Sequence, residues 1–315
     1  MTTEAQATRA GFVAIIGAPN AGKSTLINQL VGGKVSIVTH KVQTTRARVR
    51  GVAIVGASQL VFVDTPGIFA PKRRLDRAMV AAAWAGAAEA DIVALLVDAK
   101  AYTHRGEGGA NAHATKDTDA ILERLKASGR EAVLLLNKLD LVPPPELLPL
   151  TAELNAKATF RETFMISAQT GSGVEDFARW CAGAVPGGPW LYPEDQMADL
   201  PLRQLAAEIV REKLILRLHD ELPYTTTVET EKWEERGDGS ARIEATIYVA
   251  RDGQKPIVLG EKGHTIKEIG QAARIEISKL LGRPAHLFLF VKVRENWADD
   301  PERYREMGLD FPKGE

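Results

Sequence analysis

Cysteine is almost absent from this sequence: Cys181 is the single thiol among 315 residues, so no internal disulfide can form. One cysteine suits a reducing compartment. Long apolar runs are also missing, because no stretch approaches the roughly 18 residues that a membrane-spanning helix needs. The first residues lack the basic-then-apolar pattern of a secretion signal. We therefore expect a cytoplasmic protein in which Cys181 is buried in a helix.

A large excess of charge of either sign is missing as well. The 40 basic residues nearly balance the 41 acidic ones, and the formal net charge is −1. Such a chain has no global field that attracts nucleic acid, so binding of nucleic acid requires a local basic patch. The contents of 45% hydrophobic and 26% charged residues are ordinary for a globular protein, and the length predicts two domains.

A glycine-rich stretch at 17–24 fits the pattern G-x-x-x-x-G-K-[ST]. An apolar run at 12–16 predicts a buried strand before it, and apolar residues at helical spacing in 24–31 predict a helix after it. In this context the loop cradles phosphates with its backbone N–H groups, helped by the helix N-terminus, whereas a glycine-rich turn is the alternative. Lys23 would reach the β- and γ-phosphates, and the Ser24 hydroxyl would bind Mg²⁺. The nucleotide-binding residues predicted here are Gly17, Ala18, Pro19, Asn20, Ala21, Gly22, Lys23, Ser24 and Thr25.

Two polar stretches after this helix point to the same metal and phosphate. Thr44 and Thr45 end a threonine-rich segment, and a loop threonine can bind Mg²⁺ when the γ-phosphate is present. Asp64 follows an apolar run and can hold the metal through water, as a Walker-B aspartate does. Gly67 can then offer its backbone N–H to the γ-phosphate. For the DTPG sequence at 64–67 taken alone, an Asx-type turn is the alternative.

Two later apolar runs also end in polar residues. The run 132–136 is followed by the sequence NKLD, and the run 164–166 is followed by Ser167 and Ala168. Fully apolar strands are typical of a parallel sheet covered on both faces, and such sheets bind ligands at the carboxyl ends of their strands. The earlier segment 99–115 contains two histidines without metal-ligand spacing, and we predict a solvent-exposed loop there.

Together these stretches resemble the five G motifs of translation-factor-class GTPases. The resemblance implies that Asp140 pairs with the N1 and N2 edge of guanine, which is physically sound because adenine would leave the carboxylate unpaired. It also implies that Asn137 braces the base and the loop, that Lys138 packs on the ring, and that the Ala168 N–H contacts guanine O6. By the family pattern, Thr45 is the metal-binding threonine. The implied GTP-binding set adds Asp64, Thr65, Pro66, Gly67, Ile68, Asn137, Lys138, Asp140, Ser167 and Ala168; the catalytic set is Lys23, Thr45 and Gly67, and the metal set is Ser24, Thr45 and Asp64.

A proline- and glycine-rich stretch at 186–193 marks a domain boundary. We predict a GTP-binding domain at 1–185, a linker at 186–200 and an RNA-binding domain with a C-terminal tail at 201–315. The expected fold class is α/β: a P-loop NTPase domain with a mostly parallel sheet and helices on both faces, followed by an α+β domain. The α+β domain is predicted to begin with a helix whose buried face carries Leu202, Leu205, Ile209 and Leu216.

The second candidate site is the G-x-x-G sequence from Gly260 to Gly263, which lies before a helix with apolar residues at helical spacing. In KH domains such a loop clamps about four nucleotides of single-stranded backbone. From 251 to 294, nine basic residues outnumber four acidic ones, an excess of five positive charges on a nearly neutral chain. An ordinary helix cap is the alternative, and Glu261 weakens the charge argument. The predicted RNA-binding residues are Gly260, Glu261, Lys262, Gly263 and Lys267.

The order helix, strand, strand, GxxG, helix, strand resembles a type II KH fold. With the preceding domain, the chain is similar nearly end to end to bacterial Era-type GTPases, including at 190–196, 207–213, 291–293 and 296–297. This resemblance implies hydrolysis of GTP to GDP and phosphate with Mg²⁺. It also implies binding of single-stranded RNA at the 3′ end of 16S rRNA, a role in assembly and maturation of the 30S ribosomal subunit, a monomeric state, and peripheral contact with the inner membrane.

The residue after the DTPG sequence is Ile68, where Ras-type enzymes place a glutamine that orients the attacking water. An isoleucine cannot do this chemistry, so we expect slow intrinsic turnover. Asn20 is a candidate for holding a K⁺ ion, as in related GTPases. Two other functions stay open: an RNA-binding module whose nucleotide site only stabilises the fold, and a nucleotide-switched GTPase at the membrane surface or in cell-cycle signalling without a specific RNA target.

Overall fold

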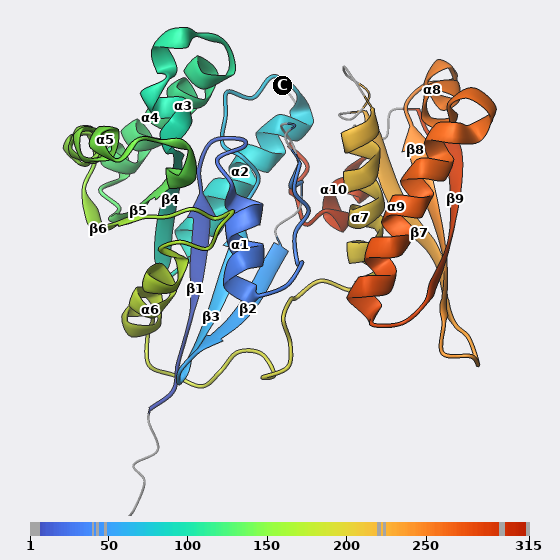
Figure 1. Cartoon of the computed structure of the whole chain (residues 1–315), viewed down its shortest axis with the longest axis horizontal. Coiled ribbons are helices and arrows are strands. Elements are labelled where there is room, and N and C mark those ends of the chain that lie inside the picture. Colours follow the sequence, from blue (N-terminus) through green and yellow to red (C-terminus); the bar gives the residue numbers. More distant parts are fainter. Residues whose placement is uncertain are drawn as a thin grey trace, which may run out of the picture. The chain divides into compact units, whose positions relative to one another are not determined.

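The structure, a computed structural model, describes residues 7–39, 41, 44–46, 49–218, 222, 225–295 and 300–312, without the side chains of 303 and 306. These residues form two compact units (Figure 1). The first unit contains the described residues of 1–36, 45–199 and 307–315, and the second contains those of 37–44 and 200–306. The chain therefore enters the second unit twice, first through segment 37–44, which follows α1 (Lys23–Val31) in the sequence.

The first unit is built on a six-stranded sheet with the order β2-β3-β1-β4-β5-β6. β2 runs antiparallel to β3, and the other neighbouring pairs are parallel. All residues of β3 and β5 are buried, because both faces of the sheet are covered. The mostly parallel sheet expected from the sequence is confirmed. Its strands are β1 (Arg9–Ile16), β2 (Val49–Val55), β3 (Ser58–Asp64), β4 (Ile92–Asp98), β5 (Ala132–Asn137) and β6 (Phe160–Met165).

Helices cover both faces of this sheet (Figure 1). On one face, α1 and α6 bury Leu26, Phe177 and Cys181 against the strands. On the other face, α2, α4 and α5 bury Ala83, Ile121 and similar residues. Burial raises the pKa of the Cys181 thiol, in keeping with the packing role expected for it. The helices are α1 (Lys23–Val31), α2 (Arg74–Glu89), α3 (Ala99–Thr103), α4 (Gly109–Ser128), α5 (Pro144–Lys157) and α6 (Val174–Ala184), with short 3₁₀ helices η1 (Arg105–Glu107) and η2 (Leu139–Leu141).

The prediction of a loop at 99–115 is wrong, because α3, η1 and the first turns of α4 occupy this stretch. Helix α3 begins where the Asp98 carboxylate accepts the Ala101 N–H at 3.0 Å, which is an N-cap interaction. In α4 the apolar buried residues, such as Ile121 and Leu125, lie in the second half. The polar first turns of α4 therefore give no apolar periodicity from which a helix could be predicted.

Residues 186–199 of the linker expected at 186–200 belong to the first unit, where they hydrogen-bond first to β1 and then to β2 and β3. The Gln59 side chain accepts the N–H of Leu191 at 2.8 Å and donates to the carbonyl oxygen of Tyr192 at 2.8 Å. The Val52 N–H donates to the Met197 carbonyl oxygen at 2.8 Å. Repeated prolines and glycines prevent regular structure here, but main-chain hydrogen bonds still order the stretch as far as Asp199.

The second unit contains a three-stranded sheet with the order β7-β8-β9, in which β7 is antiparallel and β9 parallel to β8. Helices α7 and α9 pack on this sheet and fully bury Ile209, Ile243 and Ile269. The α+β arrangement expected from the sequence is confirmed. The elements are α7 (Leu202–Arg217), β7 (Thr226–Glu235), β8 (Ala241–Val249), η4 (Asp252–Gln254), α8 (Lys255–Leu259), η5 (Glu261–Gly263), α9 (His264–Leu281), β9 (Ala285–Val293) and α10 (Pro301–Glu306).

The buried face of α7 differs in part from the expectation. Leu205 and Ile209 are buried as predicted, but Leu202 and Leu216 are 50% and 46% exposed. The buried face also includes two charged residues, Arg211 and Glu212 in the third turn, which apolar periodicity alone does not identify.

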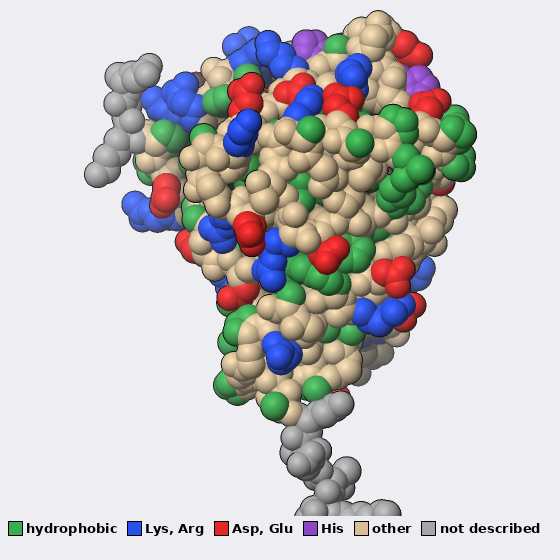
Figure 2. Space-filling view, turned by 90° about the vertical axis from the view of Figure 1, so that its left-hand side faces the viewer, with side chains coloured by type: hydrophobic (Ala, Val, Ile, Leu, Met, Phe, Trp, Pro, Cys, Tyr) green, Lys and Arg blue, Asp and Glu red, His purple; other side chains and the backbone are tan. Residues whose placement is uncertain are grey.

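The charges on the surface agree with the small net charge of the chain. On the face of the molecule seen in Figure 2, acidic and basic side chains are interspersed over most of the surface. Among the described residues, no helix is both long enough and apolar enough to cross a membrane.

Candidate GTP site and RNA-binding loop

The glycine-rich loop at 17–22 connects β1 to α1 and approaches two other elements so closely that side chains are excluded. Gly17 has a φ of 155°, and a Cβ on it would lie 2.4 Å from the carbonyl oxygen of Leu96. Gly22 has a φ of 103°, and a Cβ on it would lie 2.4 Å from Asn137 Nδ2. The curled backbone therefore requires glycine at both positions, and it ends at the N-terminus of α1, where free N–H groups favour an anion.

Lys23 begins α1 and folds back over the loop. Its Nζ donates to the carbonyl oxygens of Gly17 and Ala18, at 3.0 and 2.9 Å. Lys23 is 6% exposed, and this burial lowers its pKa to about 8, although the charge of Asp64 opposes the shift. The ammonium group is thus poorly compensated in the protein alone, and a phosphate placed in the loop would supply the missing negative charge.

Ser24, Thr45 and Asp64 converge at one point. The Ser24 hydroxyl donates to Asp64 Oδ2 at 2.8 Å and lies 3.0 Å from the Thr45 hydroxyl, which donates to the same carboxylate oxygen at 3.1 Å. Ser36 completes the cluster by donating to Asp64 Oδ2 at 2.5 Å. Ser36 was not among the predicted residues, because one serine in a loop gives no signal in the sequence.

The Asp64 carboxylate is fully buried, and its Oδ1 has no hydrogen-bond partner among the described residues. Burial raises the pKa of Asp64, and the three hydroxyl donors and Lys23 oppose this shift. A buried carboxylate oxygen without a partner is costly unless a further group binds it. Mg²⁺ prefers hydroxyl and carboxylate oxygens and keeps several waters. The residues present therefore fit Mg²⁺, and the oxygens of Ser24, Thr45 and Asp64 could hold it directly or through water.

The DTPG stretch lies against the phosphate loop through its backbone. A Cβ on Gly67 would lie 3.0 Å from Pro19, and the Ile68 N–H donates to the Gly17 carbonyl oxygen at 3.1 Å. The side chain of Ile68 is part of the core of the first unit, and the Thr65 hydroxyl donates to the Ile15 carbonyl oxygen at 2.7 Å. These residues would therefore contact GTP through their main-chain atoms.

At the end of β5, Asn137 ties two loops together. Its Nδ2 donates to the Ala21 carbonyl oxygen at 2.8 Å, and its Oδ1 accepts the Ala168 N–H at 2.9 Å. These bonds connect Asn137 to the phosphate loop and to the loop after β6, whereas its implied role toward the base stays a prediction. Because the Ala168 N–H is used by Asn137 here, its contact with guanine O6 stays a prediction.

Lys138 and Asp140 project from the next turn. Lys138 adopts a left-handed conformation with a φ of 68°, and its Nζ donates to the Asn20 carbonyl oxygen at 2.9 Å and pairs with Asp98 at 2.5 Å. Asp140 is exposed, and its Oδ1 accepts the Ser167 hydroxyl at 2.6 Å. Ser167 thus orients a carboxylate whose other oxygen can receive a ligand. Asp98 was not predicted, although its place at the carboxyl end of a strand was a usable signal.

The GxxG sequence forms the connection between α8 and α9 in the second unit. Gly260 has a φ of 73°, and a Cβ on it would lie 2.2 Å from Thr265 Oγ1 and 2.8 Å from the Thr265 nitrogen. Lys262 and Gly263 follow with φ values of 50° and 78°. Three left-handed residues within four positions produce a tight loop whose backbone a phosphate can approach closely. The side chains of Lys262 and Lys267 are exposed beside it.

Comparison with known proteins finds a family match in each of the two units. A family described as 50S ribosome-binding GTPase matches residues 12–138, and the KH domain family matches residues 221–298. A GTPase Era of Brucella suis is 65% identical over 310 residues, which cover 98% of this chain and 96% of that protein. The chain belongs to the Era family of GTPases. A second Era, from Mesorhizobium japonicum, is also 65% identical, over 99% of this chain and 97% of that protein.

Solved Era structures have the same fold over nearly the whole chain. A point variant of Aquifex aeolicus Era bound to GDP·AlF₄⁻ is 38% identical, with a TM-score of 0.85 over 96% of this chain and 99% of that one. An Era solved with MgGDPNP and nucleotides 1506–1542 of 16S ribosomal RNA is also 38% identical, with a TM-score of 0.84 over 96% and 99%. As an Era-family protein, this chain is a GTPase with a C-terminal KH domain.

Proposed function

We propose that the chain is a GTP-driven RNA-binding protein that acts on the 3′ end of 16S rRNA during assembly of the 30S ribosomal subunit. The observation that carries this proposal is the presence of a complete phosphate loop and a GxxG loop on one chain. Its support is the likeness to the Era that was solved with MgGDPNP and a 16S rRNA fragment, which covers 96% of this chain.

In the proposed reaction, water attacks the γ-phosphorus in line, and the bond between that phosphorus and the oxygen of GDP breaks. The Lys23 ammonium and the Gly67 N–H would stabilise the charge on the γ-phosphate oxygens. When bound, Mg²⁺ neutralises charge on the β- and γ-phosphates. Ser24, Thr45 and Asp64 would hold it, because their oxygens converge in the structure.

The attacking water has no orienting side chain at position 68, because Ile68 is buried in the core. We therefore propose slow intrinsic turnover that rises when another group or a bound partner positions the water. A K⁺ ion held by Asn20 is our candidate for additional positive charge. Turnover measured in KCl and in NaCl tests this: faster hydrolysis in KCl supports the K⁺ site, and equal rates exclude it.

Guanine selection is assigned to Asp140. The carboxylate is exposed, and Ser167 occupies Oδ1 at 2.6 Å, so the carboxylate can still accept from the two adjacent donors of guanine. Adenine presents no such pair of donors at this edge, and it would leave the carboxylate unpaired. GTP rather than ATP is therefore the proposed substrate.

RNA binding is assigned to the GxxG loop. Gly260 and Gly263 would let two phosphates approach the backbone, and Lys262 and Lys267 would supply positive charge. Glu261 lies in the same loop and reduces that charge. The close approach of phosphates to the glycine backbone must therefore contribute more to RNA binding than the charge of the lysines does. We further propose that GTP acts as a timer: the GTP-bound chain holds RNA, and hydrolysis releases it.

The direct test is crosslinking and capture of RNA from cells that express either the wild type or the Gly260→Asp/Gly263→Asp variant. A carboxylate in the loop repels phosphate, whereas GDP binding by the first unit serves as the control for folding. Enrichment of the 16S rRNA 3′ end that is lost in the variant supports the proposal. Absence of specific RNA in both samples overturns it.

A cytoplasmic location and a monomeric state belong to the same proposal. Size-exclusion chromatography with light scattering tests the monomer, for which a mass near 34.2 kDa is expected. The peripheral membrane contact implied by the resemblance stays a prediction, and co-sedimentation with anionic lipid vesicles tests it.

A further inference from the structure

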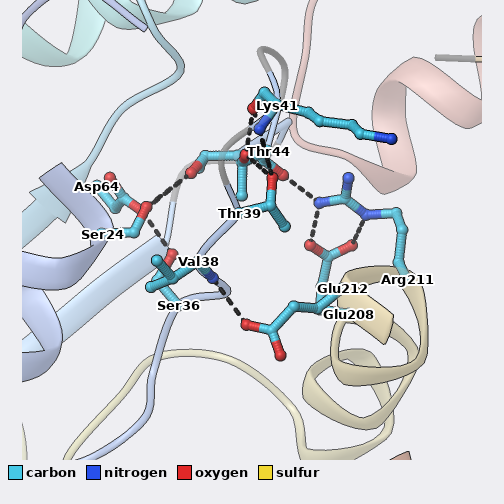
Figure 3. A network of polar contacts seen from close by, with 11 residues as sticks. Ser24, Ser36, Val38, Thr39, Lys41, Thr44, Asp64, Glu208, Arg211 and Glu212 are labelled. Atoms are coloured by element: carbon cyan, nitrogen blue, oxygen red, sulfur yellow. Dashed lines mark hydrogen bonds and ion pairs between the residues drawn. The ribbon is translucent and has the colours of Figure 1, made fainter. Parts of the chain in front are cut away.

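Segment 37–44 belongs to the second unit, whereas the residues on either side of it, Ser36 and Thr45, belong to the first. Both flanking residues donate a hydroxyl hydrogen bond to the same atom, Asp64 Oδ2, at 2.5 and 3.1 Å. Between these two anchors the segment contacts helix α7 of its own unit (Figure 3). Segment 37–44 is thus flanked by two anchored residues, Ser36 and Thr45, and it contacts α7 at Val38 and Thr44.

Arg211 and Glu212 of α7 contact the segment through its main-chain atoms. The Val38 N–H donates to Glu212 Oε1 at 2.8 Å, and Arg211 Nη2 donates to the carbonyl oxygen of Thr44. Inside the segment, the Thr44 hydroxyl donates to the Lys41 carbonyl oxygen at 2.7 Å. Arg211 and Glu212 therefore fix the path of the backbone rather than recognise particular side chains.

Both charged residues are buried, with 1% of Arg211 and 3% of Glu212 exposed. Glu208, one turn earlier on α7, pairs with Arg211 through two hydrogen bonds of 2.8 and 2.5 Å. Lys213 pairs with the second oxygen of Glu212 at 2.6 Å. Burying charges is costly even when they are paired, and apolar residues would pack the same surface more cheaply. The two buried charges therefore indicate that this part of α7 does more than pack against its neighbours.

We infer that Arg211 and Glu212 are positioning residues for GTP hydrolysis, although they lie outside all the G motifs. Arg211 holds the Thr44 carbonyl, which is part of the peptide bond to Thr45. The Thr45 hydroxyl in turn lies 3.0 Å from Ser24 Oγ at the site that fits Mg²⁺. The inference rests on the metal role proposed for Thr45. Without the α7 contacts, this hydroxyl leaves the metal site more often, while the phosphate loop and the guanine site stay intact.

The first test compares Arg211→Met with the wild type in steady-state GTP hydrolysis. The expected result is a fall in kcat of about tenfold or more, the size expected for loss of one hydrogen bond to a charged group. KM for GTP and the affinity for GDP stay unchanged, because other residues provide those contacts. Arg211→Lys, which keeps a charged donor, recovers part of the rate.

The matched control is Arg217→Met on the same helix. Arg217 is 43% exposed in its side chain and pairs with Glu268 of α9. Its kcat should equal that of the wild type. Equal losses in Arg211→Met and Arg217→Met, or a loss in GDP affinity as large as the loss in kcat, would show a merely structural role and overturn the inference.

A double-mutant cycle with Thr45→Val separates the inference from the metal role on which it depends. If Arg211 acts through Thr45, the double variant is no slower than Thr45→Val alone, because the hydroxyl to be positioned is already gone. Additive losses overturn the inference alone. A Thr45→Val variant with the wild-type rate overturns the metal role and the inference together.

Hydrogen exchange gives a readout that needs neither nucleotide nor metal. In the Glu212→Ala variant, the Val38 amide loses its acceptor and should exchange roughly tenfold faster or more, while amides of β1 exchange as before. Equal exchange of the Val38 amide in both proteins contradicts the contact between the segment and α7.

Discussion

Asp140 and Asp64 carry the same carboxyl group in opposite surroundings, and this difference decides what each can do. Asp140 is exposed at the end of the NKLD turn, where its carboxylate can accept hydrogen bonds from a base. Asp64 is fully buried among three hydroxyl donors, where burial raises its pKa and one oxygen lacks a described partner. A buried carboxylate of this kind suits a metal site, and an exposed one suits reversible recognition of a base.

Replacement of Asp140 by asparagine tests the guanine site. An amide oxygen accepts more weakly than a carboxylate, and the amide NH₂ opposes the donors of guanine. We expect Asp140→Asn to weaken GDP binding by about tenfold to a hundredfold, the range for a lost charge-assisted pair. Isothermal titration calorimetry measures the affinity. Asp119→Asn is the control, because Asp119 also accepts a hydrogen bond from a hydroxyl group, that of Tyr102 at 2.5 Å, but lies outside the site. An unchanged GDP affinity in Asp140→Asn refutes the assignment of guanine recognition to Asp140.

Lys23 predicts a pH dependence of nucleotide binding. Its pKa is lowered to about 8 in the nucleotide-free protein, and a bound phosphate raises this pKa again. Above pH 8 the free protein therefore takes up a proton when nucleotide binds, and affinity falls as pH rises. Below about pH 7 the lysine is protonated in both states, and this proton uptake disappears.

Calorimetry in two buffers of different ionisation enthalpy measures this uptake directly. At pH 8.5 the wild type should take up part of a proton on binding GDP, and Lys23→Met should lack that part. Identical proton uptake in the two proteins would contradict the role of Lys23.

Among the helices and strands, those that the sequence predicted best follow a single physical rule, the burial of apolar residues. Apolar strands such as β5 are buried on both faces, so their limits could be predicted from composition, and the residues after them fall at one edge of the sheet. The same rule missed the first half of α4, whose helix is polar there. It also missed Ser36 and Arg211, because their roles depend on neighbours brought together only by folding.

The GxxG loop gives a prediction at this scale. Alanine at Gly260 meets the Thr265 side chain at 2.2 Å and its backbone nitrogen at 2.8 Å, and it must also adopt a left-handed conformation. Gly260→Ala should therefore distort the loop and weaken RNA binding by roughly tenfold or more, since closely approached phosphates lose their contacts. GDP affinity should not change.

Gly282→Ala is the matched control for this loop variant. Gly282 has a similar φ of 65°, caps the other end of α9 and has open space where a Cβ would lie. Gly282→Ala should lower the free energy of unfolding by about 1–2 kcal/mol, because the alanine must adopt a left-handed conformation. Its RNA affinity should equal that of the wild type. Equal RNA affinities of Gly260→Ala and Gly282→Ala in an electrophoretic mobility assay would show that loop shape is not needed.

For the whole molecule, the contrast between a net charge of −1 and a local basic region predicts how RNA binding depends on salt. Contacts between lysines and phosphates release counterions, so RNA affinity should fall with salt although the chain is nearly neutral. In the variant Lys262→Ala/Lys267→Ala, the slope of log affinity against log salt should decrease by about 0.7 for each lost contact with single-stranded RNA. Fluorescence anisotropy at several KCl concentrations measures the slope, and an unchanged slope places the RNA elsewhere.

We propose that this chain couples the state of its bound nucleotide to its affinity for RNA. The most direct measurement is the affinity for an oligonucleotide of the 16S rRNA 3′ end with MgGDPNP and with MgGDP, at one salt concentration. We expect RNA to bind about fivefold or more tightly with MgGDPNP than with MgGDP, because coupling energies between two sites are typically of this size. Equal affinities in the two nucleotide states would contradict it.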